Sequence, residues 1–97
     1  MGKTLRSDAH ATLVTLLKQA REDAGLTQAV VAERLGKPQS YVAKTESGER
    51  RLDVVEFVAL VRALGAAPAV LIASLDGTMP NAARGEAEDL GGEPVGS

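Results

Sequence analysis

The sequence predicts an all-α domain of five helices followed by a disordered tail. Apolar residues make up 44% of the 97 residues and aromatic residues only 2%, so a core must be built from Leu, Val, Ile and Ala. Such a core suits compact helices better than a β-sandwich, whose strands usually contain aromatic residues. Apolar residues also recur at helical spacing, and a glycine or a proline lies at most of the expected helix boundaries.

The chain divides by composition into a flexible N-terminus at 1–7, a domain at 8–75 and an acidic tail at 76–97. Residues 1–75 hold ten Lys and Arg against eight Asp and Glu, whereas residues 76–97 hold one against five. The tail is rich in Gly, Pro and Glu and has only isolated large apolar residues. It cannot bury enough surface to offset its ordering entropy, so we expect it to be disordered.

The first predicted helix begins with Ser7 or Asp8, because either side chain can accept hydrogen bonds from the free N–H groups of a first turn. Gly25 ends it, since glycine tolerates the left-handed backbone of a helix end. Its expected apolar stripe is Leu13, Leu16, Leu17, Ala20 and Ala24.

The second and third predicted helices are short and are joined by a tight turn. The second covers 28–35, with Thr27 as N-cap and Gly36 at its end. The third starts with Pro38 at its first position, where the missing N–H does no harm, and stops at Ser47. The expected inward residues are Val31, Ala32, Leu35 and Val42. This pattern describes a helix-turn-helix, whose second helix can lie in a DNA major groove. A generic helical hairpin would show the same pattern.

The fourth predicted helix starts with Asp53 as cap and Glu56 three residues later, a variant of the capping box. It ends at Gly65. Pro68 then opens a fifth helix that covers 69–75. The expected buried face of the fourth helix is Val54, Phe57, Val58, Val61 and Leu64.

The composition excludes most catalytic and metal chemistry. Cysteine is absent, which excludes disulfides, thiolate metal sites and cysteine nucleophiles. His10 is the only histidine, and no other residue stands at a spacing that metal binding or a catalytic triad needs. We therefore expect no enzyme, no metal and no cofactor. The longest apolar stretch, 64–75, is too short to cross a bilayer, so we expect a cytoplasmic protein with no membrane partner.

Several short runs resemble a known family. They are Gly25-Leu26-Thr27-Gln28, Val31-Ala32-Glu33-Arg34-Leu35-Gly36, Gln39-Ser40-Tyr41-Val42, Lys44, Glu46 and Gly48-Glu49-Arg50-Arg51-Leu52. Over roughly residues 10–75 the sequence resembles the lambda-repressor-like, Xre-type helix-turn-helix family. The resemblance implies a five-helix lambda-repressor-like DNA-binding domain. It also implies a transcriptional regulator, here expected to be a repressor that binds double-stranded DNA at a palindromic operator as a homodimer.

The resemblance also implies which residues meet DNA. The expected contacts are Gln28, Lys37, Gln39, Ser40, Tyr41, Lys44, Ser47, Arg50 and Arg51. Gln28 matches a glutamine that contacts phosphate and braces the recognition glutamine. Gln39 matches the recognition glutamine itself, whose amide can grip adenine N6 and N7 together. Lys44 could reach guanine or only a phosphate. Tyr41 has three alternatives, which are a thymine methyl, a phosphate or partial packing.

Arg21 and Glu46 match a largely buried ion pair of the family, which would fix the angle of the recognition helix. Three residues depart from the family pattern. Lys37 and Thr45 stand where apolar residues are common, and Pro38 replaces a capping Ser or Thr. We expect Lys37 to expose its ammonium and Thr45 to thin the core.

The expected homodimer interface lies on the fifth helix. It consists of Val70, Leu71, Ile72 and Leu75, which crowd a helix too short to bury them all within one chain. The alternative function is a protein-interaction module, such as an antitoxin-like component of a toxin-antitoxin pair with a protein partner. The polar residues at 39, 40 and 44 favour DNA over such a partner.

Overall fold

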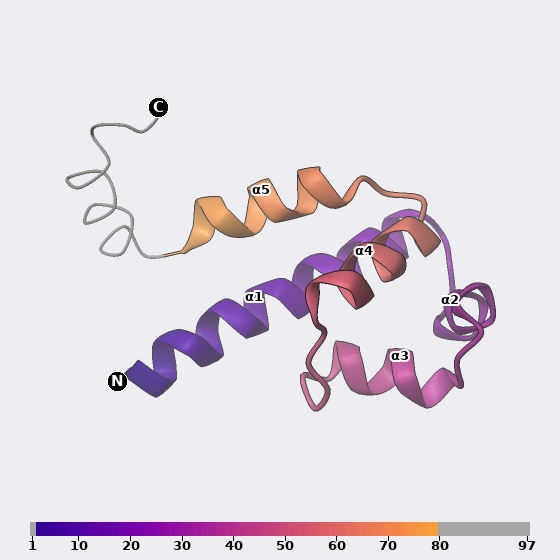
Figure 1. Ribbon diagram of the computed structural model, residues 1–97, viewed down its shortest axis with the longest axis horizontal. Helices are drawn as coiled ribbons and strands as arrows, with labels where there is room; N and C mark the ends of the chain where they lie inside the picture. The colour runs from indigo at the N-terminus through magenta and orange to yellow at the C-terminus, as the bar shows by residue number, and fades with distance from the viewer. Residues whose placement is uncertain (1, 80–97) are drawn as a thin grey trace.

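The chain folds into five helices in a computed structural model that describes residues 2–79, with side chains from residue 8 onward. Of the tail predicted at 76–97, residues 76–78 belong to the last helix, and residues 80–97 lie outside the described part of the chain. The helices are α1 (Gly2–Asp23), α2 (Gln28–Leu35), α3 (Gln39–Glu46), α4 (Val54–Ala63) and α5 (Pro68–Thr78) (Figure 1). No strand occurs between residues 2 and 79. The predicted all-α class is confirmed.

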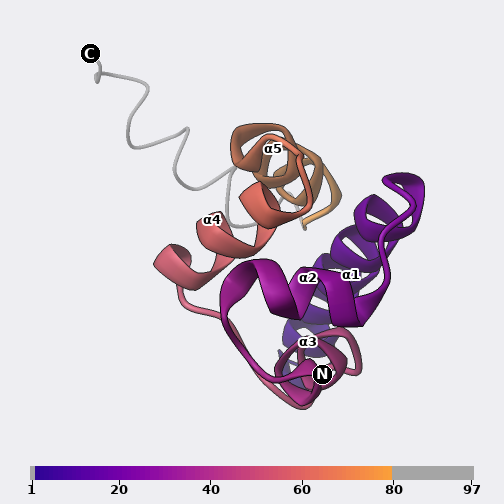
Figure 2. The ribbon, with the colours of Figure 1, turned by 90° about the vertical axis from the view of Figure 1, so that its right-hand side faces the viewer.

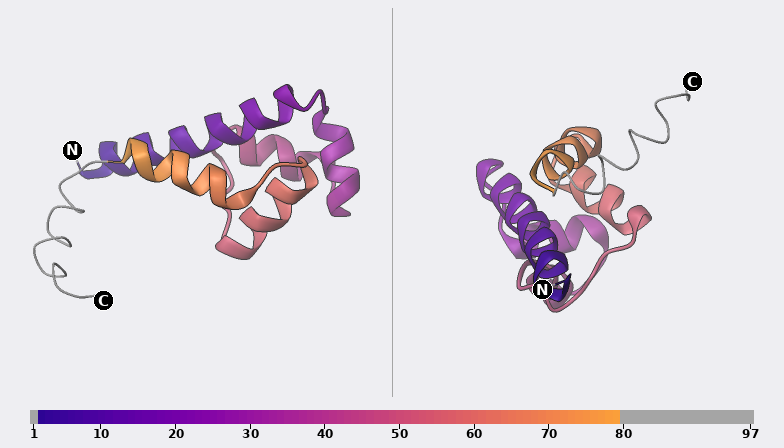
Figure 3. Two further views of the ribbon diagram at one scale, coloured as in Figure 1. Left: turned by 90° about the horizontal axis from the view of Figure 1, so that it is seen from above. Right: turned by 90° about the vertical axis from the view of Figure 1, so that its left-hand side faces the viewer.

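The long helix α1 runs through the molecule, and the shorter helices are arranged around it. It contacts α3 and α5, while α2 contacts α3 and α4. In Figure 1 and in the view turned by 90° in Figure 2, α3 lies at the bottom and α5 at the top. Figure 3 shows α5 returning alongside α1. One side of α3 is therefore left open, on the side of the molecule away from α5.

The core takes residues from all five helices. Leu17 of α1 is 1% exposed, and Val31 of α2 and Val61 of α4 are fully buried. The buried cluster is Leu17, Val31, Ala32, Val42, Phe57, Leu60, Val61, Leu64 and Leu71. Thr45, expected to thin the core, is buried there, and its hydroxyl donates to the carbonyl of Tyr41 at 2.8 Å. Its polar group is thus satisfied within α3.

The predicted caps of α2 and α4 are present. Thr27 Oγ1 accepts from the N–H of Val30 at 3.1 Å. Asp53 and Glu56 form a complete capping box, with bonds of 2.7 and 2.9 Å in the two directions. Gly36 follows α2 with φ of +68°, a backbone conformation that favours glycine. This turn lets the chain reverse within three residues and start α3.

Four predicted helix ends or faces need correction near the termini of the helices. The helix α1 begins at Gly2, not at Ser7 or Asp8, since no proline in 2–7 interrupts it. Pro38 is the N-cap of α3 and not its first helical residue, because its ψ of 155° is extended. Ala24 follows the end of α1 and is exposed. The helix α5 runs to Thr78, three residues past the expected end.

Two apolar residues lie differently from the prediction. Val54 is predicted on the buried face of α4 but is 77% exposed, and it borders an open apolar groove. Leu60 contributes to that buried face instead. Leu71 was assigned to a dimer interface but is only 9% exposed, because α5 packs against α1 and α4. Leu71 therefore belongs to the core.

No single helix within residues 2–79 combines the length and the apolar character needed to span a membrane. The one pair that reaches this length and composition together, α4 with α5, is bent by 118°.

We expect Val61→Ala to lower the free energy of unfolding by about 2 to 3 kcal/mol, because two buried methyl groups are lost and a cavity remains. The matched control is Val55→Ala on the same helix, which should change the free energy of unfolding by less than about 0.5 kcal/mol because the Val55 side chain is 78% exposed and does not line the groove beside α5. Urea denaturation followed by circular dichroism measures both. Equal losses in the two variants would contradict the described core.

Candidate nucleic-acid interface

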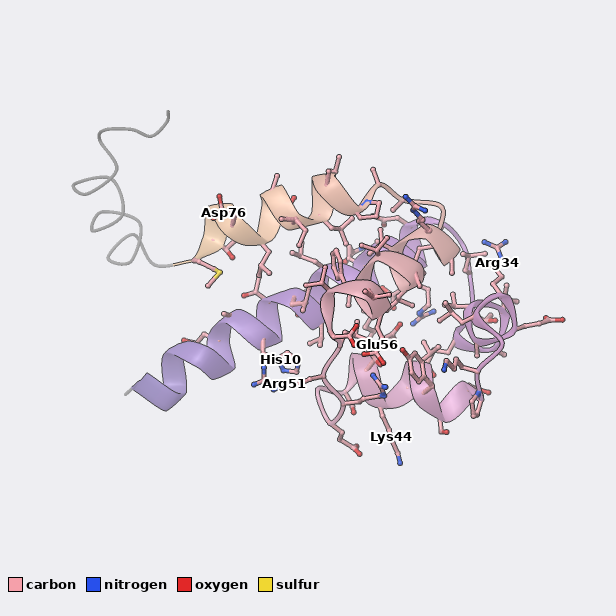
Figure 4. The ribbon with its side chains drawn as sticks, in the orientation of Figure 1. His10, Arg34, Lys44, Arg51, Glu56 and Asp76 are labelled. Carbon is pink, nitrogen blue, oxygen red and sulfur yellow. The ribbon has the colours of Figure 1, made fainter. Side chains whose placement is uncertain are left out.

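The third helix presents two different faces. Val42 and Thr45 are buried against the core, and Gln39, Ser40 and Lys44 are exposed. In the view of Figure 4, Lys44 projects away from the body of the domain. The helix is therefore anchored on one side and polar on the other, which is what a helix needs to enter a DNA groove.

An ion pair anchors this helix to α1. Arg21 Nε donates to Glu46 Oε2 at 2.6 Å, and Nη2 donates to Oε1 at 3.0 Å. The two side chains are only 11% and 8% exposed. Arg21 Nη1 also donates to the carbonyl of Leu26 at 2.7 Å. The pair that the sequence suggested is thus bidentate and largely shielded from water, a geometry that fixes orientation as well as distance.

Burial of Glu46 disfavours its charge, but the hydrogen bonds from Arg21 and Gln28 outweigh burial and hold the pKa of Glu46 below its ordinary value. The same hydrogen bond to Glu46 raises the pKa of Arg21. Both groups therefore stay charged at neutral pH.

Gln28 links this ion pair to the start of α3. Its Nε2 donates to Glu46 Oε1 at 3.0 Å, and its Oε1 accepts from Gln39 Nε2 at 3.5 Å. The contact to Gln39 is long, yet it places the two glutamines next to each other as the sequence suggested. A continuous polar chain thus runs from α1 through α3 and α2 to the first residue of α3.

The loop after α3 is tied to Tyr41. The Arg50 guanidinium lies over the Tyr41 ring, 4.2 Å from its centroid, and Lys37 Nζ lies 5.4 Å from the same centroid. Arg50 Nη2 donates to Glu56 Oε2 at 3.0 Å. This hydrogen bond raises the pKa of Arg50 and lowers that of Glu56. Burial raises the pKa of Tyr41, against the opposing charge of Arg50. Of the three alternatives for Tyr41, partial packing is present.

The remaining predicted residues, Ser47, Arg51 and Lys37, are all exposed. Ser47 Oγ lies 3.1 Å from the carbonyl oxygen of Lys44 and accepts from the N–H of Glu49 at 3.4 Å, so it shapes the turn. Arg51 is exposed and lies near His10 of α1 (Figure 4). Burial, together with the charge of Arg51, lowers the pKa of His10. Lys37 is exposed, as expected.

Sequence reasoning missed the role of Arg34. It lies on α2 (Figure 4), and its Nη1 donates to the carbonyl of Ala63 at 2.8 Å. The acceptor is at the C-terminal end of α4, where backbone carbonyls lack helical partners. No spacing in the sequence signals this bond, because its two residues are brought together only by packing.

The buried anchor, the tight turn at Gly36 and the polar outer face define a helix-turn-helix domain of the kind that binds DNA. A family model described as a helix-turn-helix domain matches residues 12–75. The chain belongs to the Xre-type helix-turn-helix family of DNA-binding regulators.

Solved structures show the same fold. An XRE-family-like protein from Pseudomonas syringae pv. tomato is 46% identical, with a TM-score of 0.77 over 81% of this chain and 96% of that one. Two structures of the clp gene regulator ClgR from Corynebacterium glutamicum both have TM-scores of 0.65. They are 25% and 27% identical over 74% and 84% of this chain and over 92% and 85% of theirs. No curated protein matches the sequence significantly.

We expect Glu46→Gln to lower the free energy of unfolding at pH 7 by about 3 kcal/mol, because the buried Arg21 charge loses its partner. Since the pKa of Glu46 is lowered by folding, the wild-type advantage is complete above the unfolded-state pKa of about 4.3 and disappears as the pH falls through the folded-state value. Urea denaturation between neutral and acidic pH measures the difference.

The control for this experiment is Glu33→Gln, an exposed position on α2. It should change the free energy of unfolding by less than about 0.5 kcal/mol at neutral pH. If the difference between wild type and Glu46→Gln stayed constant down to acidic pH, the charged pair would not be the source of the stability.

Proposed function

We propose that the chain is a sequence-specific transcriptional repressor that binds a palindromic operator as a homodimer, in the cytoplasm and without catalysis. The observation that carries the proposal is the polar chain of Arg21, Glu46, Gln28 and Gln39, which ends at the first residue of an outward-facing helix. This chain restricts the amide of Gln39 before DNA arrives. A restricted side chain loses less freedom on binding than a free one.

In this proposal Gln39 reads a base and its neighbours hold the helix in the groove. The amide of Gln39 can donate and accept at once, which matches adenine N6 and N7 in the major groove. Ser40 and Lys44 share the exposed face and can reach base edges or phosphates. Gln28 and Lys37 contact the phosphate backbone beside the turn. The polar character of this face favours DNA over a protein partner.

The homodimer is proposed through α5 and the groove beside it. The groove has a volume of about 150 Å³. Its apolar lining is Leu13, Leu52, Val54, Phe57, Ile72 and Leu75. Ile72 is 49% exposed, and Val70 on the same helix is 62% exposed. A second copy related by a two-fold axis can cover both grooves with the same residues, so the surface complements itself. Leu71 is no longer part of this proposal because it is buried.

The first test selects the sequences that the wild type binds from a random DNA pool. It then measures how tightly Gln39→Ala binds the selected sequence, its single-base variants and random DNA. We expect a short palindrome to be enriched. Gln39→Ala should reduce discrimination at one base pair per half-site by about 1 to 3 kcal/mol, because the bidentate contact is lost. Affinity for random DNA should hardly change.

Gln19→Ala is the matched control, because Gln19 is exposed on α1 and its Nε2 donates to Asp23 Oδ1 in the same helix at 2.9 Å. It should leave the base preference unchanged. Failure to enrich any sequence would contradict the proposal and favour the protein-interaction module. An unchanged preference in Gln39→Ala would show that α3 is placed wrongly in the groove.

The second test introduces a charge into the proposed dimer interface. Ile72→Asp should weaken dimerisation and operator binding by at least about tenfold, because a carboxylate buried in an apolar groove loses its hydration. Light scattering and operator titration measure the two effects. Val55→Asp is the control, since Val55 is 78% exposed and is absent from the groove lining; its self-association should not change. A monomeric wild type, free and on DNA, would rule out the homodimer.

A further inference from the structure

Arg50 is held by four contacts that reach three parts of the domain. Its guanidinium covers the ring of Tyr41 on α3. Its Nη2 donates to Glu56 Oε2 on α4 at 3.0 Å, and Nη1 lies 3.4 Å from Glu56 Oε1. The same Nη1 donates to the carbonyl of Arg51 at 2.9 Å. One side chain thus joins the recognition helix, the following loop and the first turn of α4.

The backbone of this loop is fixed in a matching way. The N–H of Arg50 donates to the carbonyl of Lys44 near the end of α3 at 3.1 Å. Gly48 has φ of +86° and makes the sharp turn between them. The Arg50 side chain is 33% exposed and the Glu56 side chain 32%, whereas Arg51 belongs to the exposed class. The two neighbouring arginines therefore have different surroundings, although both were expected to contact DNA.

We propose that Tyr41, Arg50 and Glu56 form a clamp that positions the loop between α3 and α4 on DNA, and that Arg51 alone of the two arginines contacts phosphate. Arg50 is thus a positioning residue. This inference rests on the proposed DNA-binding function. It assigns different roles to two neighbouring residues of the same surface, positioning to Arg50 and phosphate contact to Arg51. Its basis is that the face and two of the terminal nitrogens of Arg50 are already engaged inside the domain.

Arginine is the residue that such a clamp requires. Its planar guanidinium can stack on a ring and pair with a carboxylate at the same time, whereas the ammonium of lysine acts as a point charge. Lysine does keep the positive charge that a phosphate contact needs. The substitution Arg50→Lys should therefore weaken DNA binding if Arg50 acts in a clamp, and should leave it nearly unchanged if Arg50 only contacts phosphate.

Glu56→Gln also distinguishes a clamp from a phosphate contact, because the two roles predict opposite changes in DNA affinity. Removal of an acidic charge near the interface favours phosphate binding if charge alone matters. In a clamp, Glu56→Gln weakens binding because Arg50 loses its partner. Glutamine still serves the capping box with Asp53, so the start of α4 is kept. Glu49→Gln is the matched control, because it removes a charge in the same loop without touching Arg50.

The experiment measures binding of each variant to a short duplex of random sequence at several salt concentrations. Arg51→Ala should reduce the slope of log affinity against log salt by about one unit per subunit. Arg50→Ala, Arg50→Lys and Glu56→Gln should weaken binding several-fold and leave the slope close to that of the wild type. Glu49→Gln should bind at least as tightly as the wild type.

A readout without DNA tests the clamp itself. The ring of Tyr41 should shift the NMR signals of the Arg50 side chain upfield in the free protein. Tyr41→Phe should keep this shift and the affinity, whereas Tyr41→Leu should lose both. Thermal melting identifies any variant that fails to fold, and if Tyr41→Leu is one, Arg50→Lys and Glu56→Gln decide the outcome.

Three outcomes overturn the inference. They are wild-type affinity in Arg50→Lys, a loss of salt slope in Arg50→Ala equal to that in Arg51→Ala, and tighter binding in Glu56→Gln. The absence of the ring shift in the wild type also overturns it, whatever DNA does. If the wild type binds no duplex but shows the ring shift, the proposed function is wrong. The contacts of the clamp within the domain then stand, and only its role on DNA is lost.

Discussion

The buried pairing of Arg21 with Glu46 is the interaction on which the arrangement of the recognition helix depends. Neither charge is stable in this site without the other, because the loss of water must be offset by the partner. Since Arg21 lies on α1 and Glu46 ends α3, the bidentate pair joins the two helices and restricts their relative orientation. Gln28 uses the same carboxylate, so α2 is fixed too. The carboxylate of Glu46 thus joins all three helices that form the polar surface.

Much of the fold follows from local rules that act within a few residues. Thr27, Gly36 and Asp53 mark helix ends by capping and by backbone conformation, and these were predicted correctly from the sequence. Other helix ends, such as the start of α1 and the end of α5, were predicted wrongly. The remaining errors concern tertiary packing. Val54 and Leu71 both fit an apolar helical stripe, yet only the positions of α1 and α5 decide that one is open and the other is buried.

The polar surface shows the same division. The pairing of Arg21 with Glu46 and the proximity of Gln28 to Gln39 were expected from residues at the family's spacing. The stacking of Arg50 on Tyr41 was not expected, because adjacent arginines in a loop look equivalent in sequence. Which of the two turns inward depends on a ring one helix away and a carboxylate on the next helix. Side-chain direction of this kind has no periodic signal.

The bond from Arg34 to the carbonyl of Ala63 has a mechanical consequence. It joins α2, the helix before the recognition helix, to the corner that leads from α4 into α5. If two copies associate through α5, this bond restricts how far their recognition helices can move relative to each other. Such an assembly binds only half-sites that are separated by a fixed spacing. A single base pair inserted between half-sites would shift one of them by about 3.4 Å along the axis, and also turn it around the duplex, beyond what a stiff spacer can follow.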